Sequence, residues 1–226
     1  MVSLRFTPEE HELVTAAVTR AEQSSDGEIV TIVSDSSDAY HDVGLHYAVL
    51  AMLLVPTILA LLPQATVDWG SSLIFDWNAE PGRPALMALL FVALALVFLI
   101  VRYALAWRPL RMALTPGATK SRRVRRRAVA LFRASAEHRT ASRVGILLYL
   151  SLMEHRAEIV ADEAIVSKVE ADVWGEAMAD LVTEVKAGRP GSGMAKAVDR
   201  IGAVLTEHFP KTSADTNELP DRLIEL

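Results

Sequence analysis

The chain has 226 residues, a net charge of −5 and 51% hydrophobic residues. It contains no cysteine, which excludes disulfide bonds, a thiolate nucleophile and cysteine–metal sites. The charges are unevenly distributed, because residues 1–43 carry nine acids and two arginines, whereas residues 102–136 are basic and contain no acid.

Residues 1–43 predict one helix and one strand. Thr7 can cap a helix that begins at Pro8, and Glu10 stands where a capping box needs it. Apolar residues then recur at helical spacing to about Gln23. After a Ser-Ser-Asp-Gly break, Glu28–Ser34 (EIVTIVS) is short and β-branched, which predicts a buried strand.

Two long apolar runs follow, Gly44–Pro63 and Pro84–Val101. A helix needs about 20 mostly apolar residues to cross the hydrocarbon core of a membrane, and each run is near that length. The alternative is two buried helices of a soluble core. We favour a transmembrane hairpin, because Pro84–Val101 lacks the polar stripe that a core helix keeps. A signal peptide is disfavoured, because an acidic amphipathic segment precedes the first run.

Basic residues predict the orientation of this hairpin. The loop Gln64–Arg83 holds one arginine against three acids, whereas many basic residues follow the second run. The positive-inside rule therefore places the loop outside and both termini in the cytoplasm. We expect five arginines to face anionic lipid head groups, namely Arg122, Arg123, Arg125, Arg126 and Arg127. Nucleic-acid binding is the competing interpretation, and we disfavour it because the membrane explains where the cluster lies.

The second half of the chain predicts three further helices and two strands. In chain order we expect a basic helix from about Ser121 to His138, a strand Val144–Met153, a turn Glu154–Arg156, a strand Ala157–Asp162, a helix Val169–Ala187, a linker Gly188–Gly193, a helix Met194–Phe209 and an irregular or loosely docked tail Pro210–Leu226.

Neither flank of the hairpin makes a domain alone, because a single strand is not stable unpaired. Parallel pairing of Glu28–Ser34 with Val144–Met153 gives one α/β domain of about three strands and four helices, interrupted by the hairpin. The expected parts are the first part of the domain (1–43), transmembrane helix 1 (44–63), an outer loop (64–83), transmembrane helix 2 (84–107), a basic juxtamembrane linker (108–120), the second part of the domain (121–210) and the tail (211–226).

The order of these elements resembles the TPM domain, a family named for a thylakoid lumen protein, a photosystem II repair protein and a receptor modulator. The residues that carry the resemblance are Ser25–Val30, the hairpin Gly145–Leu152 with Arg156–Asp162, Trp174 in a helix, and the closing helix from Gly193. The chain looks like the bacterial integral-membrane branch, which implies that it is a multi-pass protein of the bacterial cytoplasmic (inner) membrane. The resemblance implies an αβα sandwich, with weak acid phosphatase activity, calcium binding or an assembly role in different members. Many members carry a glycine-rich turn after the third strand, whereas this chain reads Asp162–Val166 there, without glycine.

Two groups of residues are candidates for chemistry. Asp162 and Glu163 end a strand and could bind calcium or another divalent cation, with Asp26 at the same end of the sheet. The structural interpretation of Asp162 and Glu163 is a solvated strand end that caps the next segment, and we favour it. Asp38, His41 and Asp42 could likewise hold a metal or form a polar juxtamembrane loop, which we also favour.

These observations support two functional hypotheses. The first is a multi-pass membrane protein whose cytoplasmic TPM-like domain is a scaffold, assembly or quality-control factor for an unidentified protein partner. The alternative is a weak metal-assisted acid phosphatase that uses Asp162, Glu163 and Asp26. We favour the first, because phosphoryl transfer needs cations around the phosphate and the dense cations here flank the membrane. Transport is disfavoured, because the apolar runs hold no internal acid or base beyond His46 near one end.

Overall fold

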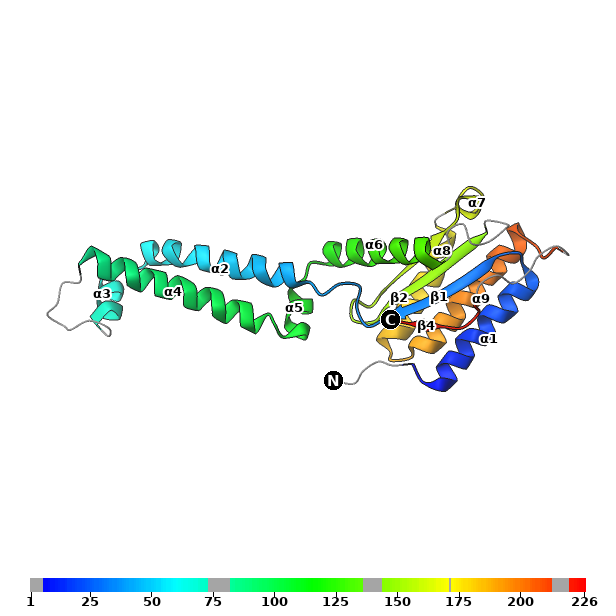
Figure 1. Cartoon of the computed structure of the whole chain (residues 1–226), viewed down its shortest axis with the longest axis horizontal. Helices are drawn as coiled ribbons and strands as arrows, with labels where there is room; N and C mark the ends of the chain where they lie inside the picture. The colour runs from blue at the N-terminus through cyan, green and yellow to red at the C-terminus, as the bar shows by residue number, and fades with distance from the viewer. Residues whose placement is uncertain (1–5, 73–81, 136–143, 171, 213–219) are drawn as a thin grey trace. The chain divides into compact units, whose positions relative to one another are not determined.

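The computed structural model describes residues 6–72, 82–135, 144–170, 172–212 and 220–226 (Figure 1). The chain divides into two compact units. The first combines Met1–Asp38 with Pro116–Leu226, and the second is Ala39–Thr115. The first unit therefore assembles from two segments that are far apart in the sequence.

The first unit is built on a four-stranded mixed sheet with the order β3-β2-β1-β4. Strand β1 (Glu28–Ser34) pairs in parallel with β2 (Gly145–Ser151), in a register that places Glu28 opposite Gly145. Strand β3 (Arg156–Ala161) returns antiparallel to β2. The predicted α/β class and the parallel pairing across the insertion are confirmed.

The fourth strand corrects the prediction of an irregular or loosely docked tail, because the end of the tail joins the sheet. Strand β4 (Ile224–Glu225) pairs in parallel with Ile32 and Val33 of β1, and Leu223 just before it is buried. The amide of Leu226 also donates to the carbonyl of Val33 over 2.9 Å. A strand of two residues has no alternating pattern of its own, so the sequence carries no signal for it.

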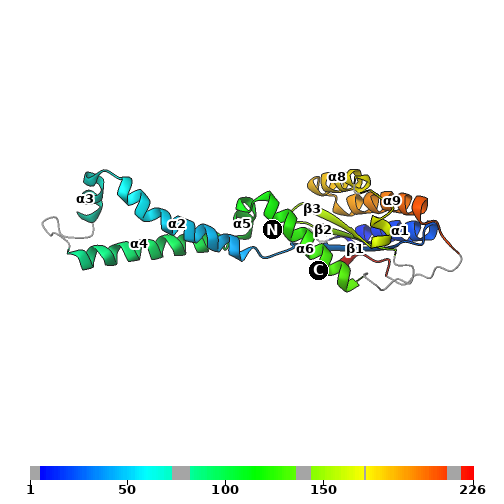
Figure 2. The ribbon, with the colours of Figure 1, turned by 90° about the horizontal axis from the view of Figure 1, so that it is seen from above.

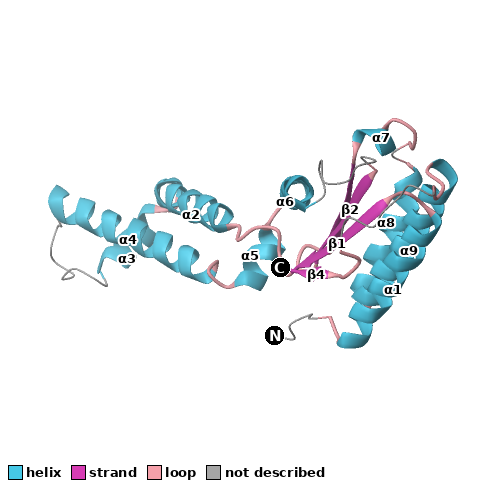
Figure 3. Cartoon of the chain, turned by 45° about the vertical axis from the view of Figure 1, so that its right-hand side comes forward, coloured by secondary structure: helices cyan, strands magenta, loops and turns pink. Residues whose placement is uncertain are grey.

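Helices cover both faces of the sheet (Figure 3). On one face, α1 (Pro8–Ser24), α8 (Val173–Lys186) and α9 (Pro190–His208) enclose the larger core with Ile29 and Leu148. On the other face, α6 (Gly117–Ser135) buries Val124, Ala128 and Phe132 against Val30, Ile32, Leu147 and Tyr149. Alternate residues of β1 and β2 therefore enter different cores, as the period of a strand requires.

Helix α1 begins where the sequence predicts, and helix α6 begins earlier than predicted. Helix α1 has the expected capping box, in which Glu10 N donates to Thr7 Oγ1 over 3.2 Å and Thr7 N donates to Glu10 Oε2 over 2.9 Å. Helix α6 begins at Gly117 rather than near Ser121. Its predicted end at His138 lies outside the described residues.

The predicted helix Val169–Ala187 and the linker before α9 both require correction. A short helix α7 (Glu163–Val166) precedes α8, which begins only at Val173. Helix α9 begins at Pro190, so its first turn includes most of the predicted linker. Proline is favourable at the first helical position. Gly191 is needed for close packing, because a Cβ there would lie 2.5 Å from Cβ of Glu10.

The second unit contains four helices within its described residues: α2 (His41–Leu61), α3 (Gln64–Ser72), α4 (Arg83–Ala104) and α5 (Arg108–Leu114). Helices α2 and α4 pack side by side (Figures 1 and 2). Part of the expected loop is helical, as α3, and part of the expected basic linker is helical, as α5. Asp76, Trp77 and Glu80 of the loop lie outside the described residues.

Candidate functional site

Helices α2 and α4 are both long and apolar enough to span a membrane. In the most apolar stretch of α2 only 17% of residues are buried, and in that of α4 none is. Leu53, Phe91 and Ile100 are 59%, 70% and 65% exposed. A soluble monomer rarely exposes a continuous apolar surface of this kind, so the two helices need an apolar environment or a partner.

Helix α5 holds a buried arginine that the sequence did not single out. Arg111 is 4% exposed, and its Nη1 donates to the carbonyl of Leu105 over 3.0 Å. Its own carbonyl accepts from Thr115 Oγ1 over 2.8 Å. Charge counting includes Arg111 among the basic residues after the second apolar run, whereas its guanidinium closes the turn after α4.

The basic face of α6 is partly neutralised within the first unit. Oδ2 of Asp38 lies 3.0 Å from Arg123 Nη1 and 3.2 Å from Arg126 Nη2. Arg125 Nη1 lies 3.3 Å from Oε2 of Glu158 on β3. Burial raises the pKa of Glu158 and outweighs the opposing effect of the Arg125 charge. Three of the five arginines expected to face lipid therefore also contact acids of the same unit.

A hollow of about 360 Å³ lies on this face, lined by Thr119, Arg122, Arg123 and Arg126. These positions are three and four residues apart, so they share one side of the helix. Within the described part of the chain, Arg122 and Arg127 make no ion pair. The arginines that line this hollow can bind an anionic oxygen of a ligand. The carboxylate of Asp38 already occupies such a position beside Arg123 and Arg126.

The carboxyl end of β1 carries a buried hydroxyl network that sequence reasoning missed. The phenol of Tyr149 lies 2.5 Å from Oγ of Ser34 and 3.0 Å from Oγ of Ser37. Nearby, Glu154 accepts from Ser151 Oγ over 2.5 Å and from Ser37 N over 2.9 Å. Isolated hydroxyls in a strand give no sequence signal, because their partners are distant in the chain. The network holds the loop after β1 against the turn after β2.

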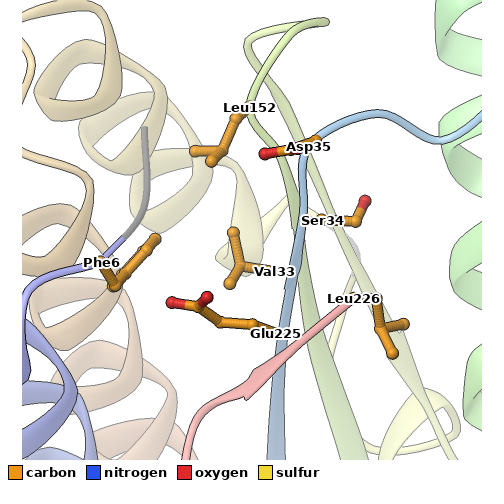
Figure 4. A pocket seen from close by; sticks show the side chains of 7 residues that line it. All are labelled: Phe6, Val33, Ser34, Asp35, Leu152, Glu225 and Leu226. Carbon is orange, nitrogen blue, oxygen red and sulfur yellow. The ribbon is translucent and has the colours of Figure 1, made fainter. Parts of the chain in front are cut away.

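The expected acidic group at the same end is divided between the two units. Asp35 and Asp38 belong to the first unit, whereas His41 and Asp42 form the first turn of α2 in the second. A cavity of about 300 Å³ lies beside Asp35, lined also by Phe6, Val33, Ser34, Leu152, Glu225 and Leu226 (Figure 4). At the nearby tail, His11 Nε2 lies 2.8 Å from Glu225 Oε1.

The candidate catalytic and metal residues lie at the opposite end of the sheet. Asp162 directly follows β3, and its Oδ2 accepts from the amide of Gly145 over 2.9 Å. Both carboxylate oxygens of Asp26 accept from Thr212, one from its amide and one from its hydroxyl, each over 2.7 Å. Glu163 is exposed in the first turn of α7. Asp26 and Asp162 therefore tie backbone segments together.

The described ranges contain no group of three or more histidine, aspartate or glutamate side chains arranged to hold a metal ion. Asp162 and Glu163, the two acids proposed to bind calcium, are adjacent in the chain but have different structural roles. Asp162 closes the β2–β3 ladder, and Glu163 begins a helix.

Among the described acids of the first unit, Glu22 has the pKa that departs furthest from its ordinary value. It is 6% exposed, and its Oε1 accepts from the amide of Ile29 over 2.9 Å. Burial is the main cause that raises its pKa to about 8, and the charges of Glu28 and Asp221 raise it further. Asp221 itself accepts from Thr19 Oγ1 over 2.8 Å, so the tail is bound beside this buried acid.

No family model matches the chain, and no curated protein matches it. Among solved structures, the chain is similar to the NMR structure of the BA42 protein from the psychrophilic bacterium Bizionia argentinensis. The two are 15% identical, and the match covers 100% of this chain and 99% of that chain with a TM-score of 0.56. At this identity the similarity shows a shared fold.

Proposed function

We propose that this protein is a multi-pass protein of the bacterial inner membrane whose TPM-like α/β unit is a cytoplasmic scaffold, assembly or quality-control factor. The observation that carries the membrane part is the outward apolar surface of α4, in which no residue of the most apolar stretch is buried. A transmembrane hairpin formed by α2 and α4 gives that surface a lipid environment.

The basic helix α6 supports the same proposal. It follows the second unit directly in the chain, and it presents Arg122 and Arg127 without acidic partners among the described residues. Cations next to a cytoplasmic membrane surface attract anionic lipid head groups, each contributing about 1 kcal/mol. The lipid is therefore a partner in this proposal, and nucleic acid is not.

The scaffold role fits how the first unit uses its polar groups. The carboxylates of Asp26 and Asp162 bind backbone amides, and those of Asp38 and Glu158 bind arginines of α6. Groups that are engaged in this way hold segments in place. The alternative hypothesis is phosphomonoester hydrolysis assisted by a divalent cation. It predicts that the purified protein hydrolyses a phosphomonoester in the presence of the cation and that Asp162→Asn loses this activity.

The membrane proposal is tested by alkaline extraction of membranes from cells that express the full chain. We expect the protein to stay in the membrane pellet. Arginine in the middle of a membrane helix costs about 2.5–3.5 kcal/mol, so Leu96→Arg, at a residue 53% exposed on α4, should reduce the retained fraction.

The matched control is Leu13→Arg on α1, where the leucine is 47% exposed in the first unit. The control should be retained like the wild type. Release of the wild-type chain by alkali, or equal loss in both variants, contradicts the proposal.

A further inference from the structure

Strand β3 is an edge strand whose outer side pairs with no other strand in the described part of the chain. It is six residues long, contains no proline and pairs with β2 in one continuous register. An edge of this kind presents unpaired N–H and C=O groups that can bind a further strand.

The register shows which backbone groups face outward. The amide of Asp162 donates to the carbonyl of Gly145, and the amide of Gly145 donates to the Asp162 side chain, so the N–H of Asp162 faces β2. In an antiparallel ladder residues that face the partner strand in this way alternate with residues that do not, so Glu158 and Val160 bond to β2 as well. The N–H and C=O groups of Ala157, Ile159 and Ala161 therefore point away from the sheet.

A hollow of about 390 Å³ lies at the start of this edge. It is lined by the turn and first residues of β3 (Glu154–Glu158) and by Val182 and Lys186 of α8. The groove between an edge strand and a helix is a common place for a peptide to add to a sheet, with backbone bonds on one side and side-chain contacts on the other.

The charges of this hollow favour an acidic ligand. Glu154 is engaged with Ser151 and with the amide of Ser37, and Glu158 is engaged with Arg125. Lys186 is exposed, and within the described ranges it makes no ion pair. The ammonium of Lys186 is therefore available to a carboxylate.

A second copy of the chain fits this edge less well than a foreign segment. Antiparallel pairing of β3 with its own copy keeps the same sheet face of both copies on one side, so the two α6 helices would become neighbours. Arg125, 67% exposed on its side chain and located over β3, would then approach its own equivalent. Like charges brought together at an interface are unfavourable, so pairing with a second copy is disfavoured.

We propose that the outer edge of β3 binds an extended segment of a partner protein as an added strand, with an acidic residue of that segment beside Lys186. This inference rests on the scaffold role proposed above and names the kind of partner. It involves the first unit alone, so the strand-addition proposal can fail while the membrane proposal holds, and the membrane proposal can fail while strand addition holds.

The probe is a short peptide of alternating threonine and valine with two glutamates at one end, added to the full chain in detergent micelles. We expect it to slow the amide exchange of Ala157, Ile159 and Ala161 by about tenfold or more, because strand addition protects outward amides. A peptide of the same sequence that is N-methylated at every residue has no backbone N–H to donate, and its methyl groups block both edges, so it should leave these rates unchanged. Equal protection by both peptides, or none by the first, contradicts the proposal.

Two sets of variants separate the backbone and charge contributions. Ile159→Pro removes an outward N–H and keeps the bonds to β2, so it should abolish protection, whereas Ile159→Val should keep it. Lys186→Glu should weaken binding of the glutamate peptide and strengthen binding of a peptide that carries lysines in place of the glutamates. This comparison also tests the proposal if the proline variant does not fold. Protection that rises with protein concentration without peptide would assign the edge to a second copy and overturn the proposal.

Discussion

Asp38 and Arg123 form an ion pair that connects the two segments of the first unit. The Oδ2 atom of Asp38 lies 3.0 Å from Nη1 of Arg123. Asp38 is the last residue of the first unit before the chain enters the second, and Arg123 lies on the helix that follows the return. Arg126 contacts the same carboxylate oxygen, so one acid holds two cations of α6.

Removing this carboxylate should take one ion-pair partner from each of the two arginines. We expect Asp38→Asn to lower the free energy of unfolding by about 0.5–1 kcal/mol, since partly exposed ion pairs contribute little. It should also raise the affinity of the protein for vesicles that contain anionic lipid, measured by co-sedimentation.

The control for that experiment is Asp35→Asn, which removes the same charge from an exposed acid at the same end of the sheet. If lipid affinity rises equally in both variants, net charge rather than the loss of the ion pairs of Asp38 with Arg123 and Arg126 explains the effect.

Glu22 predicts how stability depends on pH. Its pKa is about 8 in the folded protein, above the ordinary value of 4.5, because the folded protein buries it near Glu28 and Asp221. Between those two values the folded state holds a proton that the unfolded state has lost. The stability contributed by this proton is fully present below pH 4.5 and falls as the pH rises through about 8.

Glu22→Gln keeps the shape and removes the titration. We expect the decline in unfolding free energy between pH 5 and pH 8 to become shallower in this variant, as measured by urea unfolding at several pH values. An unchanged slope would show that Glu22 is not the group responsible.

The phenol of Tyr149 should contribute measurably to stability. It lies within hydrogen-bond distance of the hydroxyls of Ser34 and Ser37, and Tyr149 and Ser34 are buried. Tyr149→Phe should lower the unfolding free energy by about 1–3 kcal/mol, because it leaves buried hydroxyls with one partner fewer.

The pairing is checked by a double-mutant cycle with Ser34→Ala. The two effects should be less than additive if the hydroxyls bond to each other. Full additivity would contradict the network.

Close packing of α1 and α9 depends on Gly202. A Cβ at that position would lie 2.6 Å from Cβ of Ala21, so one helix must shift. Gly202→Ala should lower the unfolding free energy by about 1–3 kcal/mol, as overpacked core positions do.

Gly175 provides the matched comparison, because a Cβ there meets no atom within 4 Å. It lies in helix α8, where alanine is about 1 kcal/mol more favourable than glycine. Thermal unfolding of the two variants should therefore shift in opposite directions. A shift in the same direction would contradict the packing account.

The elements with strong local patterns could be predicted from the sequence. The bounds of β1 were correct at both ends, because Glu28–Ser34 is a compact β-branched run between polar breaks. The start of α1 followed from its capping box. The parallel pairing of β1 and β2 followed from the need of a single strand for a partner.

The errors arise where long-range packing decides. The two residues of β4 are a strand only because β1 offers them an edge. The first turn of α9 is helical despite its glycines, because they allow close packing against Glu10 and Leu181. The link between Asp38 and α6 joins residues 85 or more positions apart, and no local pattern indicates it.

The most direct test of the central claim uses the absence of cysteine in the chain. Single cysteines are placed in the full chain at Thr66 of α3 and at Thr183 of α8, both exposed. Intact spheroplasts are then treated with a maleimide that does not cross membranes. Labelling of Thr66→Cys at once, and of Thr183→Cys only after lysis, is the result that we predict. Labelling of Thr183→Cys in intact spheroplasts, or of neither before lysis, would contradict a hairpin that places the α/β unit in the cytoplasm.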